Sequence, residues 1–455
     1  MNPYADALQQ SGMSAAEADA KCRLFDQLQR LAHELGIGTF QHAFFVPGRI
    51  EVLGKHTDYA GGCSLLCCVE RGFCVIASPR RDRTVRFVDA ISGERSEFPF
   101  ETSFELPQRG WAAYPATVAK RIAANFSHSK IGADALFASD LPRASGMSSS
   151  SALVVASFLA LAAANDLAKT EPYHRNIQSN EDLATYLGCI ENGSTFRELI
   201  GNRGVGTFGG SEDHTAILCC EANRISQFSF CPTRFERSLE LPKELTLAIA
   251  VSGVAADKTG SAMTKYNRLS LAVRSILEIW NRETARDDSS LAAALSSSKT
   301  AENDLRKILS SAPTNLDIPL LDRFQQFVSE SCSIIPEAVD ALAARDWHRF
   351  GDLVDQSEQN AEQLLKNQTA ETVFLARTAR EHGALAASAF GAGFGGSVWA
   401  LINEEHAEEF LTEWSGAYRD HFPQQTKSAF FLSRPGPPAT RIPLGNADSF
   451  TSTAV

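Results

Sequence analysis

The spacing of apolar residues predicts a chain that mixes helices and strands in its first half. Residues 14–35 repeat apolar side chains at a helical period, with Ser14 and Glu17 in a capping-box pattern and Gly36 where the helix would end. Short apolar runs typical of strands occupy residues 40–50, 72–79, 84–90, 131–142, 215–222 and 225–230. Helices are expected over residues 111–126 and 152–164, and within the polar residues 170–210, which become loop-like toward their end.

The second half opens with an apolar strand at residues 244–254 and continues with longer periodic segments. These predict helices over residues 259–284, 290–310, 321–346 and 353–381. A glycine-rich loop then runs into a strand within residues 388–402. From Ser433 onward the chain is rich in Pro, Gly, Ser and Thr, so we expect a tail with a mobile end.

Length and charge narrow the class of protein. A chain of 455 residues exceeds what one hydrophobic core usually holds, so we expect an N-terminal domain over 1–240, a C-terminal domain over 241–432 and the tail over 433–455. The hydrophobic content of 44% is ordinary for a globular protein. The net charge of -11 disfavours a nucleic-acid or anionic-membrane partner, because both need a basic face.

The cysteines and the N-terminus favour a cytoplasmic location. Most of the 10 cysteines lie in apolar runs without zinc-ligand spacing, which indicates buried, reduced thiols. The first ten residues, MNPYADALQQ, lack the basic and apolar regions of a secretory signal. The apolar run 152–164 is too short to span a bilayer and predicts a buried helix.

The first of three candidate loops is PGRIEVLGKHTDYAGG, residues 47–62. Its Gly-Lys pair suggests a nucleotide-binding P-loop, whose signature is G-x-x-x-x-G-K-[ST]. Five residues separate Gly48 from Gly54, however, and His56 stands where the Mg²⁺-binding hydroxyl should be. One extra residue redirects every amide of a phosphate nest, so the P-loop interpretation is rejected.

The second loop, PRASGMSSSSAL at residues 142–153, precedes the alanine-rich helix. Small residues allow a ligand close to the backbone, and the helix start offers free N–H groups and a positive dipole end. This arrangement suits a phosphate, although a solvated turn that only caps the helix would have the same composition. The third loop, FGAGFGGSVWAL at residues 390–401, precedes a strand and would by itself be an ordinary tight connection.

Taken together and in order, the three motifs resemble those of the GHMP small-molecule kinases. The first resembles the galactokinase signature, with GKHTDYAGG where that family usually has G-E-H-T-D-Y-N-G-G, and WAAYPATVAKRI is similar to a family helix. The resemblance runs from about residue 40 to 405. It implies a two-domain α/β (α+β) fold, with a ribosomal-protein-S5-domain-2-like N-terminal domain, a ferredoxin-like C-terminal domain, and ATP and sugar in the cleft.

The resemblance assigns the nucleotide and metal to the serine loop. Gly146, Ser148, Ser149, Ser150 and Ser151 would bind the ATP phosphates in place of a Walker loop. Ser150 matches a Mg²⁺-binding serine. Glu191 matches an acidic residue that helps to hold Mg²⁺, although about ten more residues separate it from the next motif than in the family.

The resemblance also assigns catalytic and sugar-binding residues. Arg49 would lie beside the transferring phosphate, and Asp213, in GGSEDHTAIL, matches the aspartate of the family segment G-x-M-D-Q. Asp213 would act as a general base or would orient the hydroxyl and stabilise charge. Residues matching sugar contacts are His56, Asp58, Gly210 and Tyr266.

Purely structural roles compete with these assignments, although the motif context makes them minor for Arg49, Asp58 and Asp213. An arginine near a strand end is often a surface ion pair, and a single aspartate in a loop often forms a turn. For Glu191 and Tyr266 such roles compete directly with the functional ones.

Lys55 departs from the family pattern at a position implied to contact the sugar C6 hydroxyl. A cation there would pair with a C6 carboxylate, so a uronic acid such as galacturonate is a plausible substrate. Lys55 could equally turn toward solvent or donate to a neutral hydroxyl. SEDH in place of M-D-Q also changes both neighbours of Asp213.

We therefore expect an ATP- and Mg²⁺-dependent kinase that phosphorylates the anomeric C1 hydroxyl of a galactose-like monosaccharide. The same chemistry on a uronic acid or a pentose is one alternative, and a catalytically silent sugar sensor is another. The expected partners are the sugar and ATP alone, in a monomer or weak homodimer.

Overall fold

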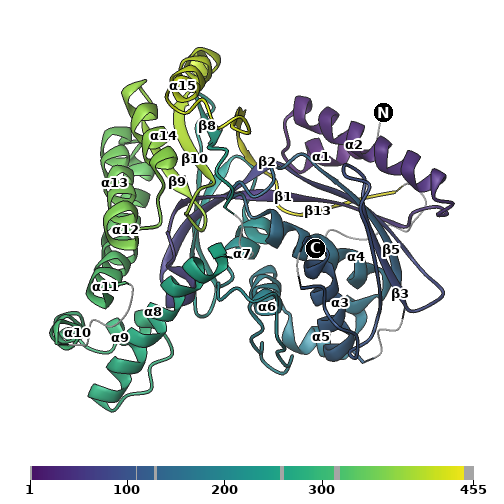
Figure 1. Cartoon of the computed structure of the whole chain (residues 1–455), viewed down its shortest axis with the longest axis horizontal. Coiled ribbons are helices and arrows are strands. Elements are labelled where there is room, and N and C mark those ends of the chain that lie inside the picture. The colour runs from purple at the N-terminus through teal and green to yellow at the C-terminus, as the bar shows by residue number, and fades with distance from the viewer. Residues whose placement is uncertain (1–2, 109, 128–130, 257–260, 312–317, 445–455) are drawn as a thin grey trace.

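The computed structural model describes residues 3–444, apart from 109, 128–130, 257–260 and 312–317 (Figure 1). Within these residues the chain has a mixed α/β fold built on two sheets, as predicted. No helix in this part of the chain combines the length and the apolarity needed to cross a membrane. All ten cysteines are free thiols, and only Cys231 and Cys332 are exposed.

The larger sheet belongs to the N-terminal half and has nine strands among the described residues. Its central order is β13-β1-β2-β5-β3-β4, with β6 and β12 also paired to the long β2 and β7 paired to β6. Every pairing is antiparallel except β3 with β5. The strands are β1 (His42–Leu53), β2 (Cys63–Pro79), β3 (Thr84–Asp89), β4 (Arg95–Pro99), β5 (Ala133–Ser139), β6 (Arg224–Ser229), β7 (Arg234–Glu240), β12 (Pro435–Gly436) and β13 (Thr440–Ile442).

Helices cover both faces of this sheet because its strands are apolar on both sides. On β1, Phe45 packs toward α1 (Pro3–Gln10) and α2 (Ala15–Glu34), whereas Phe44 and Val46 pack into the opposite core. Figure 1 shows α1 and α2 on one side of the sheet and the other helices of this half on the opposite side. Those helices are α3 (Ala113–Asn125), α4 (Ser149–Ala164), α5 (Glu171–Asn176), α6 (Asn180–Asn192) and α7 (Glu212–Cys219), with short turns η1 (Asp58–Ala60) and η2 (Leu167–Lys169).

The smaller sheet, in the C-terminal half, is antiparallel in the order β11-β8-β10-β9. Its strands are β8 (Leu245–Val251), β9 (Ala386–Phe390), β10 (Ser397–Asn403) and β11 (Ala429–Ser433). One face packs against α14 (Ala370–Glu381) and α15 (Ala407–His421), and the other packs toward α12 (Ile335–Ala344) and α13 (Trp347–Asn360). Beside this sheet α8 (Ser261–Thr284), α9 (Leu291–Ser296), α10 (Ala301–Ser310) and α11 (Leu320–Val328) share a separate core.

The helix bounds differ from prediction where short loops or π turns interrupt the pattern. The segment 290–310 is two helices, α9 and α10, and the segment 353–381 is broken between η4 (Ala361–Leu365) and α14. The predicted helix 321–346 is continuous through the π turn η3 (Ser329–Ile334), and a short turn η5 (Glu404–His406) precedes α15. The first two residues of the predicted helix 259–284 lie outside the described residues.

The predicted strand at residues 215–222 is wrong, because most of it forms α7. This helix begins after Ser211 and carries Glu212 and Asp213 in its first turn, where acidic groups complement the helix dipole. The run from Thr215 to Leu218 is buried on every side. A short, fully buried apolar run has no periodicity that separates a helix from a strand.

The capping box predicted for α2 is also wrong, although the helix itself is as predicted. The Ser14 side chain makes no capping hydrogen bond. Its backbone N–H donates instead to Glu70 Oε1 at 2.6 Å, and Glu17 forms an ion pair with Lys21. A distant residue, Glu70, therefore binds the start of this helix in place of the local capping partner.

The segment after Ser433 is not a separate tail. Residues 435–442 return to the N-terminal half, where β12 pairs with β2 and β13 forms the edge of the sheet beside β1 (Figure 1). Ala439 and Ile442 are buried there. The predicted mobile end, residues 445–455, lies outside the described residues.

Candidate active site

Three loops that are distant in the sequence meet between the two sheets. A Cβ on Gly391 would come within 2.7 Å of the carbonyl oxygen of Gly146, so these loops touch backbone to backbone. Ser397 Oγ donates to the Ser145 carbonyl at 2.6 Å. Arg49 Nη1 donates to the Gly146 carbonyl at 2.6 Å and joins the first motif to the other two.

Arg49 and Asp213 form the central ion pair. Arg49 Nε and Nη2 lie 2.8 and 2.6 Å from Asp213 Oδ1, and the arginine is 3% exposed. Burial alone would lower the pKa of Arg49, but the carboxylates of Asp213 and Glu51 outweigh it and raise the pKa. Asp213 Oδ2 accepts a second hydrogen bond from Ser151 Oγ at 3.2 Å. Its carboxylate is thereby held in one orientation.

A polar cavity opens beside this pair. The predicted site residues that line it are Arg49, His56, Asp58, Ser151, Glu191, Gly210, Asp213 and Tyr266. They come from β1, the loop after it, α4, α6, α7 and α8, and Gly391 and Ala392 of the third loop complete the wall. The structure thus gathers these motif positions around one cavity.

Tight packing fixes the side chains expected to face a sugar. His56 adopts a left-handed backbone with φ of 59°, and its Nε2 lies 3.1 Å from the Ala392 carbonyl oxygen. A Cβ on Gly210 would come within 2.3 Å of Asp58 Oδ2, so a side chain there would displace the carboxylate. Burial, reinforced by nearby carboxylates, raises the pKa of Tyr266 well above its usual value and keeps its hydroxyl protonated.

The serine loop faces a second, larger cavity. Ser148 has φ of 55° and precedes α4, and its buried hydroxyl has no hydrogen-bond partner. Gly146, Ser148, Ser149 and Ser150 line this cavity, whose volume is ≈ 430 Å³. Arg49 and Ala392 line both cavities. The lining of this cavity also contains apolar residues that sequence reasoning missed, among them Ile91, Trp111, Tyr114, Phe137 and Leu153.

Of the two serines Ser150 and Ser151, Ser151 is the one hydrogen-bonded to Glu191, the predicted acidic metal ligand. Ser151 Oγ lies 2.9 Å from Glu191 Oε2 and 3.2 Å from Asp213 Oδ2 and can donate its one proton to either, whereas Ser150 lines the larger cavity. Glu191 Oε2 also lies 3.3 Å from His214 Nε2. Among the described residues, no three His, Cys, Asp or Glu side chains form a metal-binding group of their own.

Two buried glutamates in the polar cavity were not predicted as site residues. Glu212 is hydrogen-bonded to Glu51, accepts from Ser64 Oγ at 2.7 Å and is 5% exposed. Burial, followed by repulsion from Glu51 and Asp58, raises the pKa of Glu212 well above its usual value. Glu51 lies two residues after Arg49 on β1, so strand periodicity could have identified it.

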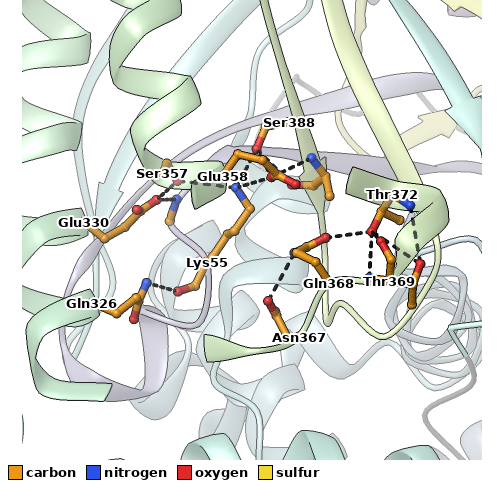
Figure 2. Close-up of polar contacts among 12 residues, drawn as sticks. Lys55, Gln326, Glu330, Ser357, Glu358, Asn367, Gln368, Thr369, Thr372 and Ser388 are labelled. Atoms are coloured by element: carbon orange, nitrogen blue, oxygen red, sulfur yellow. Dashed lines mark hydrogen bonds and ion pairs between the residues drawn. The ribbon is translucent and has the colours of Figure 1, made fainter. Parts of the chain in front are cut away.

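Lys55, predicted to meet a sugar C6 group, does not line the polar cavity. Its ammonium is 2.6 Å from Ser388 Oγ and 3.4 Å from Glu358 Oε2, and the residue is 1% exposed (Figure 2). The side chain points into the C-terminal half because a carboxylate there compensates its charge. The alternative in which Lys55 turns toward solvent is wrong, because the residue is buried.

Known families match all three motif regions of the chain. Residues 113–193 match the GHMP kinases N terminal domain and residues 338–420 match the GHMP kinases C terminal domain. Together with the site, these matches define the chain as a member of the GHMP kinase family. Residues 32–79 match the galactokinase galactose-binding signature, so within this family the chain is galactokinase-like.

Individual relatives agree with this classification. The galactokinase of Roseiflexus sp. (strain RS-1) is 29% identical over 381 residues, which cover 82% of this chain and 86% of that protein. The galactokinase of Actinobacillus pleuropneumoniae is 26% identical and covers 89% of this chain and 95% of that protein. The structure of Lactococcus lactis galactokinase complexed with galactose has the same fold, with a TM-score of 0.75, 21% identity, and coverage of 91% of this chain and 99% of that chain.

Proposed function

We propose that the protein is an ATP-dependent kinase that transfers a phosphoryl group to the anomeric C1 hydroxyl of a galactose-like monosaccharide. The observation that carries this proposal is the position of Arg49, which lines both the polar cavity and the cavity of the serine loop. Phosphoryl transfer depends on positioning and positive charge between donor and acceptor, and a buried guanidinium at the junction supplies both.

Asp213 would bind the attacking hydroxyl. Its carboxylate is held by Arg49 on Oδ1 and by Ser151 on Oδ2, at the edge of the polar cavity. A carboxylate fixed in this way orients a C1 hydroxyl and accepts its proton as the oxygen attacks phosphorus. Arg49 would stabilise the negative charge of the transferring group.

The larger cavity suits ATP. Its apolar wall fits a purine, and its serine side has small residues, the start of α4 and the unpartnered Ser148 hydroxyl. Glu191 and Asp213 converge on the Ser151 hydroxyl, and such oxygen groups fit Mg²⁺, which needs few protein ligands when phosphates supply the rest. When bound, Mg²⁺ would neutralise phosphate charge, with Glu191 and a serine of the loop as its protein ligands.

The polar cavity suits a neutral sugar. His56, Asp58 and Tyr266 supply acceptors and donors for sugar hydroxyls, and Asp58 can accept from two adjacent hydroxyls. Glu51, Asp58 and Glu191 would repel a C6 carboxylate, and Lys55 is paired elsewhere. We therefore propose galactose rather than galacturonate, in a reducing cytoplasm, with no nucleic-acid or membrane partner and in a monomer or weak homodimer.

A coupled assay of ADP release tests the proposed function. The panel contains galactose, glucose, arabinose and galacturonate, each at equal concentration with ATP and Mg²⁺, and a reaction without sugar corrects for ATP hydrolysis. We expect turnover with galactose and none above background with galacturonate. Binding of galactose without ADP release would instead identify a silent sensor, and turnover of galacturonate alone would reverse the substrate assignment.

A further inference from the structure

The turn after β1 is held by side chains of the C-terminal half at three consecutive residues. Gly54 N donates to Glu330 Oε1 at 2.9 Å, and the Lys55 carbonyl accepts from Gln326 Nε2 at 3.0 Å. Arg323 donates to the His56 carbonyl at 2.5 Å. All three partners lie on α11 and η3, so the first motif is attached to the second half through its backbone.

The Lys55 side chain adds a charged contact to this attachment. Its ammonium lies 2.6 Å from Ser388 Oγ on β9, 3.3 Å from Ser357 Oγ on α13 and 3.4 Å from Glu358 Oε2. Glu358 Oε2 in turn accepts from Ser388 Oγ at 2.8 Å and from Ala389 N at 3.1 Å. The carboxylate is therefore held rigidly opposite the cation.

The side-chain contacts of Lys55 are also connected to the backbone contact of Gly54. Ser357 Oγ donates to Glu330 Oε1 at 2.9 Å, the same oxygen that accepts from Gly54 N (Figure 2). Lys55 and Glu330 are almost wholly buried. In such a site the loss of one charged partner leaves the other uncompensated, and the surrounding groups must rearrange.

This network is one residue away from the sugar-facing cavity. His56 follows Lys55 in a left-handed conformation, which a non-glycine residue keeps only when its surroundings fix it. His56 Nε2 contacts the Ala392 carbonyl, and Ala392 lies four residues beyond Ser388, the serine bound by Lys55. The lysine thus holds both segments that meet at His56.

We propose that Lys55 and Glu358 form a positioning pair that sets the sugar-facing turn against the C-terminal half without contacting the sugar. The pair controls the affinity for sugar through His56 and Asp58, and neither Lys55 nor Glu358 itself lines either cavity. The kinetic part of this proposal rests on the proposed function.

The test compares Lys55→Met, Glu358→Gln and the double variant. Lys55→Met leaves Glu358 uncompensated, so we expect the KM for galactose to rise about tenfold or more and the KM for ATP to change less than about twofold. Lys55→Met/Glu358→Gln removes both charges and keeps an acceptor for Ala389 N. We expect it to return the galactose KM to within about threefold of the wild-type value.

Lys21→Met is the matched control, because Lys21 is also fully buried and paired, with Asp140 and Glu17, but lies on α2 outside both cavities. It should lower the melting temperature and leave both KM values unchanged. The proposal would be overturned if Lys55→Met changed only the melting temperature, as this control does. It would also be overturned if the galactose KM of the double variant were no lower than that of Lys55→Met. Turnover of galacturonate by the wild type that is lost in Lys55→Met would also overturn the proposal, since Lys55 would then bind the substrate.

Hydrogen exchange separates this proposal from the proposed function. Amide exchange in residues 54–62 and 391–396 of the ATP-free protein should be faster in Lys55→Met than in wild type, and near wild type in the double variant. If no sugar is phosphorylated, the proposed function fails while this measurement still decides the positioning role. Unchanged exchange in both segments would refute it.

Discussion

Asp213 is the residue at which binding and turnover can be separated. Its carboxylate accepts from Arg49 and Ser151, and an amide at the same position keeps the volume but loses the charge. We expect Asp213→Asn to lower kcat by about 10²–10⁴-fold, the usual contribution of a positioned base. Affinity for ATP, measured by calorimetry, should change only a fewfold. A kcat within tenfold of wild type would remove Asp213 from the chemical step.

Burial raises the pKa of the Glu212 carboxyl in the folded protein, and this has a consequence for stability. Its pKa is raised by burial above the ordinary value of 4.5, so the unfolded chain releases the proton first as the pH rises. This contribution to stability is fully present below about pH 4.5 and is lost as the pH rises through the folded pKa.

Glu212→Gln should remove this pH-dependent contribution to stability, because glutamine does not titrate. Between pH 5 and pH 8 the free energy of unfolding of wild type should fall more steeply than that of the variant, by up to about 1.4 kcal/mol per pH unit. Urea unfolding at several pH values measures both slopes. Parallel slopes would mean that Glu212 is ionised in the fold.

At the scale of elements, the contact between the second and third loops depends on glycine at position 391. In Gly391→Ala the new Cβ would lie 2.7 Å from the Gly146 carbonyl oxygen, which also accepts from Arg49. We expect the serine loop to move and the KM for ATP to rise about tenfold, as for other misplaced binding groups.

Gly383→Ala is the control for this substitution. Its φ of +94° gives a similar backbone strain, but no atom lies within 4 Å of the new Cβ. It should lower stability and leave the KM for ATP unchanged. Equal kinetic effects of the two substitutions would show that strain, not the loop contact, is responsible.

Sequence patterns predicted the elements well where their period was distinct. β1, β3, β8, α2 and α4 form where predicted, because strand alternation or a long helical period was present. Helix α7 was missed because a short helix of eight residues, six of them buried, carries no such signal. The motifs also identified most residues of the polar cavity, whereas the direction of the Lys55 side chain depends on Glu358, about three hundred residues away in the chain.

At the scale of the whole molecule, the last described strands connect the two halves. Asn223 N donates to the Pro435 carbonyl and Ala439 N to the Ile217 carbonyl, both at 2.7 Å. Ending the chain at residue 433 removes these bonds and the burial of Ile442, so we expect a loss of about 3 kcal/mol or more of stability. A chain ending at residue 444 keeps both strands and is the control. Thermal unfolding compares them, and equal melting temperatures would contradict this role.

The central claim is that the phosphoryl group goes to the anomeric hydroxyl of a galactose-like sugar. Nuclear magnetic resonance of the product made from galactose and ATP tests it most directly, because phosphorus splits the signal of the proton on the phosphorylated carbon. The account predicts a sugar 1-phosphate whose anomeric proton is coupled to phosphorus. Phosphate on any other carbon, or ADP formed without a sugar phosphate, would contradict it.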